Sequence, residues 1–230
     1  MKAFVLAGGL GTRLRPRFGD LPKPLAILGG QPFLARQLAW LAGHEIRDVV
    51  LCVGHGAGEV RETLGDGAAL GVRLSYSEEP QPLGTGGALR LAQSWVDGPA
   101  LVLNGDTLPE LDPHALEKAR AEQAAIGALA LYQSEHAAAG GRVEFDDAGR
   151  ITRFVEKDSA FRGPAWVSGG CYAFADALWE RIPPGVSSLE RDVLTPLASA
   201  GELVAFRAAG TFYDIGTPEG WERAERRFAS

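Results

Sequence analysis

The chain has 230 residues, of which 46% are hydrophobic and 23% charged, with a formal net charge of −6. This length suits one α/β domain that buries roughly 70% of its unfolded surface, and it is short for two ordinary domains. The acidic balance argues against a nucleic-acid-binding protein, which needs a broad basic face. The two cysteines, Cys52 and Cys171, lie in apolar stretches far apart and predict buried side chains without a disulfide.

The first part of the chain alternates apolar runs with segments of helical periodicity. Buried strands are predicted at residues 3–6, 49–53, 72–76 and 100–103. Between these runs, residues 33–42 and 85–95 carry apolar side chains at the spacing of a helix. Helical connections of this length favour parallel neighbours with right-handed crossovers, so we expect a Rossmann-like, doubly wound α/β fold.

The second part has more closely spaced strands, which predict antiparallel strands added to a mainly parallel sheet. Asp112 and Pro113 are typical of a helix start, and that helix is expected to reach Ala125. Strands are predicted at 127–132, 141–145, 151–155 and 166–174, with a hairpin turn at 146–149. Helices near 189–198 and 218–228 follow, the second with Thr217 as its N-cap. We expect one domain, 1–230, made of two halves, 1–110 and 111–230.

The opening apolar run is too short for a secretory signal, and no run approaches the ~18 apolar residues of a membrane helix. We therefore expect a cytoplasmic protein without membrane contacts. The sequence leaves the oligomeric state open, a homo-oligomer included.

A glycine-rich loop follows the first predicted strand, with Leu6, Ala7, Gly8, Gly9, Gly11, Thr12 and Arg13 in sequence around it. Such glycines let backbone N–H groups approach phosphate oxygens closely, and Arg13 and Lys23 add positive charge. A Walker A loop is excluded because no Gly-Lys pair occurs. Leu14 takes the place of the third glycine of a dinucleotide fingerprint, which argues against a nicotinamide-dependent oxidoreductase.

Polar residues come directly after three other predicted strands: Glu79, Asn104 with Asp106, and Asp214. Ligands of open α/β sheets bind beyond the carboxyl ends of the strands. Mg²⁺ takes one or two carboxylates together with waters and substrate phosphates, so Asp106 and Asp214 are candidate magnesium ligands. Each aspartate alone would also suit a turn, and Ser188 with Glu190 would also suit a helix start.

The motif Gly-Gly-x-Gly-Thr-Arg-Leu at 8–14 with Pro22-Lys23-Pro24 resembles the sugar-1-phosphate nucleotidyltransferases, and the resemblance continues in order to Pro218. It implies transfer from a nucleoside triphosphate to a sugar 1-phosphate, with the sugar phosphate in the half 111–230. Asp106 and Asp214 match the metal carboxylates, and Arg13 and Lys23 the phosphate-binding cations. The implied nucleotide-binding positions are Leu6, Ala7, Gly8, Gly9, Gly11, Thr12, Arg13, Lys23, Glu79, Gly84 and Thr85. The implied sugar-phosphate positions are Asn104, Gly141, Glu156, Lys157, Gly170 and Glu190.

The nucleobase is expected to meet Glu79. An ionised carboxylate only accepts hydrogen bonds, and guanine offers two adjacent donors, whereas uracil and thymine offer one N–H between acceptors. GTP is therefore favoured, and the loop also resembles guanylyltransferases for D-glycero-D-manno-heptose 1-phosphate and mannose 1-phosphate. A UTP-dependent enzyme for a sugar such as N-acetylmuramate 1-phosphate, or a thymidylyl- or cytidylyltransferase, stays open as an alternative. A non-catalytic nucleotide-sugar sensor would be expected to lose Arg13 or a metal carboxylate, and this chain keeps them.

Overall fold

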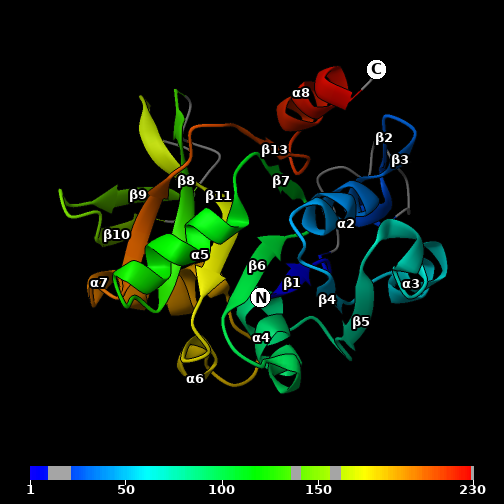
Figure 1. The fold of residues 1–230 in the computed structure, drawn as a ribbon, viewed down its shortest axis with the longest axis horizontal. Coiled ribbons are helices and arrows are strands. Elements are labelled where there is room, and N and C mark those ends of the chain that lie inside the picture. The colour runs from blue at the N-terminus through cyan, green and yellow to red at the C-terminus, as the bar shows by residue number, and fades with distance from the viewer. Residues whose placement is uncertain (10–21, 136–140, 156–161, 229–230) are drawn as a thin grey trace.

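The structure is a computed structural model that describes residues 1–9, 22–135, 141–155 and 162–228. Within these residues, nine strands form one sheet with the order β10-β9-β11-β6-β1-β4-β5, and β8 and β12 join it beside β11 (Figure 1). The strands are β1 Lys2–Leu6, β4 Asp48–Val53, β5 Arg73–Glu78, β6 Ala100–Asn104, β8 Gly127–Ser134, β9 Arg142–Phe145, β10 Ile151–Val155, β11 Ala165–Phe174 and β12 Leu203–Arg207. The sheet therefore takes strands from both halves of the chain.

The four strands of the first half are parallel to one another, as predicted. β1 pairs with β4 on one side and with β6 on the other, and β5 lies beyond β4. The direction in which strands are added thus reverses between β1 and β6. In doubly wound sheets the ligand crevice opens at this switch point, which here is the end of β1 that carries the glycine-rich loop.

The second half adds the predicted antiparallel strands. β11 runs antiparallel to β6, β8 and β9, and β12 runs parallel to β8. β9 and β10 form a hairpin whose turn is the predicted one: Gly149 N–H donates to Asp146 O at 2.9 Å, and Gly149 has φ +80°. The mixed, mainly parallel α/β sheet of the sequence analysis is confirmed.

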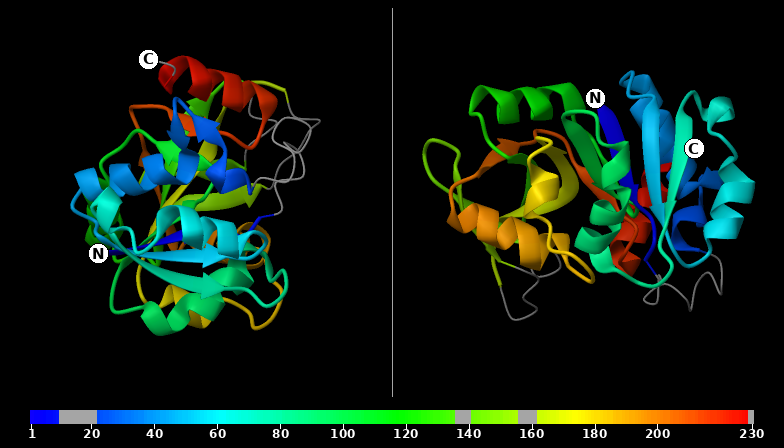
Figure 2. Two further views of the ribbon diagram at one scale, coloured as in Figure 1. Left: turned by 90° about the vertical axis from the view of Figure 1, so that its right-hand side faces the viewer. Right: turned by 90° about the horizontal axis from the view of Figure 1, so that it is seen from below.

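Helices cover both faces of the sheet (Figure 2). One face packs against α2 (Phe33–Gly43), α3 (Ala57–Leu64) and α5 (Pro113–Glu122), and the other against α4 (Gly84–Leu91), α6 (Leu178–Arg181) and α7 (Thr195–Ser199). Strand residues alternate between the two cores: in β1, Ala3 and Val5 enter the first and Phe4 the second. This period of two is what buries a strand on both sides.

A third apolar cluster fixes the C-terminal helix α8 (Pro218–Phe228). Its fully buried Trp221 packs with Tyr213 and Ile215, and with Leu28 of the short β2–β3 ribbon (Ile27–Leu28 and Gln31–Pro32). Tyr213 belongs to β13 (Phe212–Asp214), which pairs with β7 (Thr107–Pro109) outside the main sheet. α8 therefore anchors the segment that carries Asp214.

Several predicted elements differ in their bounds. The helix predicted at 85–95 is α4 to Leu91 followed by a 3₁₀ turn, Ala92–Trp95, and the helix expected to reach Ala125 ends at Glu122. The predicted helix at 189–198 is a π-helix, Leu189–Leu194, continued by α7. Helices α3 and α6, strands β7 and β12, and the β2–β3 ribbon were not predicted from the sequence. β7 has three residues and pairs with a strand more than a hundred residues away, so it leaves no local periodicity to detect.

Cys52 and Cys171 are both buried and free, as predicted. Burial raises the pKa of the Cys52 thiol to about 12, so it stays protonated and unreactive. None of the helices described is long and apolar enough to span a lipid bilayer.

Thr217 caps α8 as predicted, because its Oγ1 accepts the N–H of Gly220 at 3.0 Å. Loss of such an N-cap costs about 1 kcal/mol, so Thr217→Ala should lower the free energy of unfolding by that amount in urea titrations. Thr217→Ser keeps the acceptor oxygen and should stay within a few tenths of the wild type. Equal stability of the alanine and serine variants would contradict this role.

Candidate active site

A cavity of about 1390 Å³ opens at the switch point of the sheet and extends into the second half. Ligand pockets usually measure roughly 300–1,000 Å³, so this cavity has room for two substrates side by side. Every predicted site residue that the structure describes lines it: Leu6, Ala7, Gly8, Gly9, Lys23, Glu79, Gly84, Thr85, Asn104, Asp106, Gly141, Gly170, Glu190 and Asp214. Gly11, Thr12, Arg13, Glu156 and Lys157 lie outside the described residues.

The backbone at the end of β1 is held by both neighbouring strands. Ala7 N–H donates to Cys52 O at 2.8 Å, and Gly105 N–H donates to Leu6 O at 2.9 Å. The hydrogen-bonding pattern of the sheet therefore continues into the start of the glycine-rich loop. This fixes the backbone at the point where the loop begins.

Asp106 and Asp214 meet by a route that the sequence analysis did not foresee. We expected both at the ends of strands in one sheet, but β13, which ends in Asp214, belongs to the separate two-stranded ribbon with β7. In that ribbon Asp214 lies opposite Thr107, the neighbour of Asp106, and Ile215 N–H donates to Asp106 O at 2.9 Å. The ribbon thus brings the two aspartates together at the mouth of the switch point.

The charged groups of these two segments converge on Gly216. A Cβ added there would lie 2.7 Å from Asp214 Oδ1, 2.8 Å from Lys23 Nζ and 3.1 Å from Asp106 Oδ2. Lys23 also forms an ion pair with Asp106, with Nζ and Oδ2 2.5 Å apart. Two carboxylates and an ammonium group therefore surround one point, and the side chain of any residue other than glycine at position 216 would fill it.

This donor set fits Mg²⁺ better than a metal that needs a full set of protein ligands. In the described ranges, no three or more histidine, cysteine or acidic side chains gather where they could hold a metal by themselves. Mg²⁺ needs only one or two carboxylates because substrate phosphates and waters complete its shell. Two hard oxygen donors beside a large cavity meet that requirement.

Glu79 lies between the glycine-rich loop and the end of β4. Its Oε2 accepts the N–H of Leu83 at 2.7 Å, and its Oε1 fills the space that a side chain at Gly8 would need. Burial raises the pKa of Glu79, and the hydrogen bond from Leu83 partly opposes that shift. The carboxylate is therefore fixed at one end of the loop that leads to α4.

The glycines at the start of α4 have a role that the sequence analysis missed. Gly86 N–H donates to Ser187 O at 2.9 Å, and Ser187 N–H donates to Leu83 O at 2.9 Å. A Cβ at Gly84 would lie 2.5 Å from Ser187 O, and one at Gly87 2.6 Å from Gly185 O. These glycines let two backbones touch across the halves. Several glycines within one helical pattern are the signal that could have revealed it.

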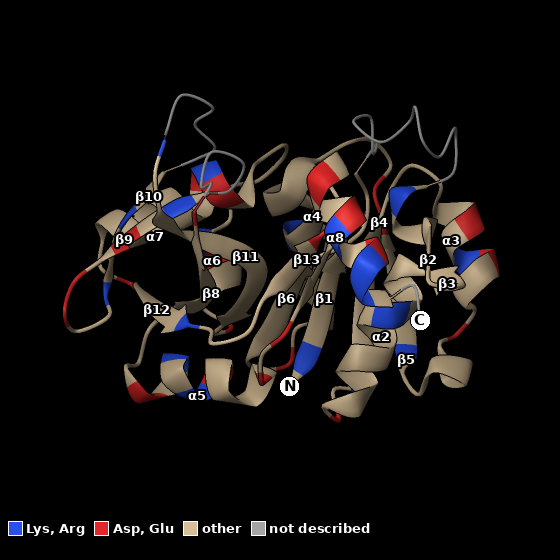
Figure 3. Cartoon of the chain, turned by 90° about the horizontal axis from the view of Figure 1, so that it is seen from above, with Lys and Arg blue, Asp and Glu red and all other residues tan. Residues whose placement is uncertain are grey.

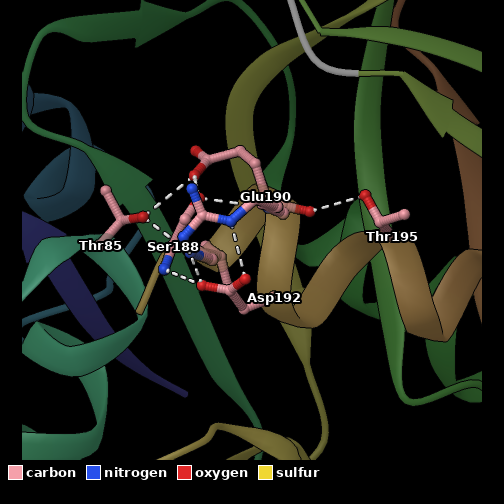
Figure 4. Close-up of polar contacts among 7 residues, drawn as sticks. Thr85, Ser188, Glu190, Asp192 and Thr195 are labelled. Carbon is pink, nitrogen blue, oxygen red and sulfur yellow. Dashed lines mark hydrogen bonds and ion pairs between the residues drawn. The ribbon is translucent and has the colours of Figure 1, made fainter. Parts of the chain in front are cut away.

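Glu190 is held by two hydroxyl groups, as Figure 4 shows. Its Oε2 accepts from Thr85 Oγ1 at 3.0 Å and from Ser188 Oγ at 3.1 Å. Ser188 also caps the π-helix, since its Oγ accepts the N–H of Arg191 at 3.2 Å. The helix-start interpretation of Ser188 is thus correct, and the same helix start carries Glu190 into the cavity.

A bulge in β11 shapes the wall between the aspartates and Glu190. At Gly170 the chain has φ +66°, and a Cβ there would lie 2.8 Å from Asn104 Nδ2. Asn104 Oδ1 is buried and has no hydrogen-bond partner among the described residues. Bulges of this kind are common beside active sites.

The charges around the cavity are mixed in sign. In the cartoon of Figure 3, Lys and Arg residues are interspersed along the chain with Asp and Glu residues, and α8 carries both. Glu219 and Arg223 of α8 line the cavity itself. The described residues on this face therefore carry charges of both signs.

Comparison with known proteins gives a family match over nearly the whole chain: the nucleotidyl transferase model matches residues 2–230. The chain belongs to this family. The mannose-1-phosphate guanylyltransferase of Mycobacterium tuberculosis is 35% identical over 225 residues, which are 96% of this chain and 62% of that protein. The mannose-1-phosphate guanylyltransferase catalytic subunit beta of Danio rerio is 34% identical over 224 residues, 95% of this chain and 62% of that protein.

Among solved structures, HddC from Yersinia pseudotuberculosis, complexed with GMP-PN, superposes with a TM-score of 0.84 at 27% identity, covering 99% of each chain. The two guanylyltransferases are longer, and this nucleotidyl transferase spans about 62% of their length. The match with HddC is end to end, so the whole described fold is that of a nucleotidyl transferase.

The raised pKa of Glu79 gives a pH dependence of stability with a definite sign. A carboxyl whose pKa is higher in the folded than in the unfolded state favours folding at low pH, and that contribution is lost as the pH rises through the folded-state pKa. Glu79→Gln does not titrate, so the Tm of the variant minus that of the wild type should increase between about pH 4 and pH 7.

The matched control for this measurement is Glu78→Gln, which removes an exposed carboxylate one residue earlier. A Tm difference for Glu79→Gln that is constant or falls over this range would show that burial does not govern the titration of Glu79.

Proposed function

We propose that this nucleotidyl transferase joins a nucleoside triphosphate to a sugar 1-phosphate, releasing pyrophosphate, with GTP as the preferred donor. The acceptor we favour is D-glycero-D-manno-heptose 1-phosphate or mannose 1-phosphate. The observation that carries the proposal is the convergence of Asp106, Asp214 and Lys23 at one point in the wall of a cavity with room for both substrates. The same cavity is lined by Gly8 and Gly9 of the glycine-rich loop and by Glu190.

In the reaction, an oxygen of the sugar phosphate attacks the α-phosphorus in line, and the bond from that phosphorus to the β-phosphate oxygen breaks. Pyrophosphate leaves with the bonding electrons. A sugar phosphate is already ionised near neutral pH, so no general base is required. The protein contributes alignment and charge neutralisation, which dominate phosphoryl-transfer catalysis. We assign Lys23 and Lys157 to the attacking phosphate, Arg13 to the pyrophosphate, and Asn104, Gly141, Glu156, Gly170 and Glu190 to the acceptor.

We further propose that Asp106 and Asp214 hold Mg²⁺. Bound there, the ion would supply positive charge that offsets the negative charge of the triphosphate and of the sugar phosphate.

The preference for guanine rests on Glu79 and on the relatives. Glu79 lines the cavity beside Gly8 of the glycine-rich loop, and its carboxylate would match the paired N–H donors of guanine. The two relatives reported above are guanylyltransferases, and HddC was solved with GMP-PN, a guanine nucleotide. A UTP-dependent enzyme for N-acetylmuramate 1-phosphate, or a thymidylyltransferase, is the alternative if the carboxylate faces away from the base.

The direct test measures pyrophosphate release from each of the four nucleoside triphosphates with a panel of sugar 1-phosphates, with magnesium and with a chelator. We expect GTP to give the highest kcat/KM and the chelator to stop the reaction. Release that is fastest with UTP or dTTP would contradict the guanylyl assignment. No release with any pair would favour a nucleotide-sugar sensor.

Asp106→Asn and Asp214→Asn should each abolish turnover, because each removes a hard anionic ligand from the metal while keeping the side-chain volume. Asp112→Asn is the matched control, since Asp112 caps α5 away from the cavity and asparagine caps as well as aspartate. All three variants should melt cooperatively in thermal scans. Near-native turnover of either cavity variant at limiting magnesium would refute the metal assignment for that aspartate.

Glu79→Gln tests the base. The substitution keeps the shape of the side chain but places an NH₂ donor where one carboxylate oxygen would face a guanine donor. A mispaired polar group in a binding site costs about 1 to 3 kcal/mol, so the ratio of kcat/KM for GTP to that for UTP should fall by roughly 5- to 150-fold. An unchanged ratio would show that Glu79 does not read the base.

A further inference from the structure

The hydroxyl of Thr85 connects the first turn of α4 with the carboxylate of Glu190, 105 residues further along the chain. We propose that Thr85 is a positioning residue: its side chain orients Glu190 toward a hydroxyl group of the sugar and makes no direct contact with the nucleotide. This inference rests on the proposed function, and it reassigns a side chain that the sequence analysis placed with the nucleotide.

The hydrogen bonds of Thr85 decide between the two roles. Its Oγ1 donates to Glu190 Oε2 at 3.0 Å and accepts the N–H of Leu189 at 2.8 Å (Figure 4). A hydroxyl group has a single hydrogen, and here that hydrogen is donated to the carboxylate of Glu190. The side chain therefore has no proton left to donate to a phosphate oxygen, although the Thr85 backbone stays available to the nucleotide.

The carboxylate of Glu190 is oriented with one oxygen held and the other left for a ligand. The hydroxyls of Thr85 and Ser188 both donate to Oε2, and none of the hydrogen bonds described in this chain ends on Oε1. Glu190 is half-buried and lines the cavity. A carboxylate oxygen only accepts hydrogen bonds, and the hydroxyl groups of a sugar are donors of the right kind.

The backbone around Glu190 is fixed as well. The Glu190 carbonyl accepts from Thr195 Oγ1 at 3.0 Å, and Ser188 N–H donates to Asp192 Oδ2 at 2.8 Å. The segment is π-helical, a conformation that is rare and found mostly at functional sites. A long side chain loses rotamer entropy when it is fixed, so hydroxyls that fix it before the sugar arrives reduce the cost of binding.

The backbone that carries Thr85 is itself fixed by hydrogen bonds. The hydrogen bonds between Ser187 and the residues Leu83 and Gly86 join the start of α4 to the segment before Glu190, and the Leu83 N–H is in turn bound by Glu79. These hydrogen bonds fix the position of Glu190 relative to the loop that runs from Glu79 to Thr85, beside the proposed base site.

The test compares Thr85→Val with Thr85→Ser in steady-state kinetics with GTP and the best sugar 1-phosphate. Valine keeps the branched shape but neither donates to Glu190 nor accepts from Leu189. We expect Thr85→Val to lower kcat/KM for the sugar 1-phosphate about 10-fold or more, as for a lost hydrogen bond to a charged group, with little change in the KM for GTP. Serine should restore nearly wild-type values.

Two further variants separate positioning from general damage to the fold. Thr63→Val makes the same substitution away from the cavity, where the hydroxyl donates to the Glu59 carbonyl, so it should not change the KM for the sugar 1-phosphate by more than about twofold. In a double-mutant cycle, Thr85→Val should have little further effect once Glu190→Ala is present, since Thr85 acts through the side chain of Glu190.

An equal rise in both KM values, additive effects in the cycle, or wild-type kinetics of Thr85→Val in an active enzyme would each overturn the inference and leave the proposed function intact. Absence of pyrophosphate release by the wild type with every substrate pair would overturn both.

Discussion

Two carboxylates that face one point repel each other unless positive charge is placed between them, and this constraint governs the centre of the molecule. Asp106 and Asp214 are brought to Gly216 by the β7–β13 ribbon, and the ammonium group of Lys23 lies at the same place. Proline on both sides of Lys23 limits the backbone there, and a short 3₁₀ turn, Lys23–Leu25, begins at the lysine. The segment after the glycine-rich loop thus delivers a cation to the carboxylates.

The same constraint gives the C-terminal helix α8 its role, which is to hold Asp214 in place. Asp214 is carried by a three-residue strand that would not be stable alone, and its position depends on Trp221, Tyr213 and Ile215 packing in one apolar cluster. None of the described residues of α8 belongs to either of the two main cores. Its burial instead stabilises the segment from Asp214 to Gly220, where Gly216 and the cap Thr217 also lie.

The two halves of the chain are also in direct contact. The start of α4 and the segment 185–190 touch backbone to backbone, which only glycine permits at that separation. Glu79 and Glu190, which we propose bind the base and the sugar, are thereby joined through one continuous set of hydrogen bonds. An enzyme that aligns two anionic substrates for in-line attack benefits from such rigidity, because alignment supplies most of its catalysis.

The sequence by itself determined the features whose signals are local. The parallel strands, the hairpin turn at 146–149, the N-caps Asp112, Thr217 and Ser188, and the buried cysteines all follow from periodicity or from a few adjacent residues, and the structure confirms them. The family also followed from contiguous motifs. Tertiary structure alone decided how Asp214 reaches Asp106, why α4 begins with several glycines, and that the hydroxyl of Thr85 serves Glu190. These are contacts between segments about a hundred residues apart, and they depend on the packing free energy of whole layers, which leaves no periodic trace in the sequence.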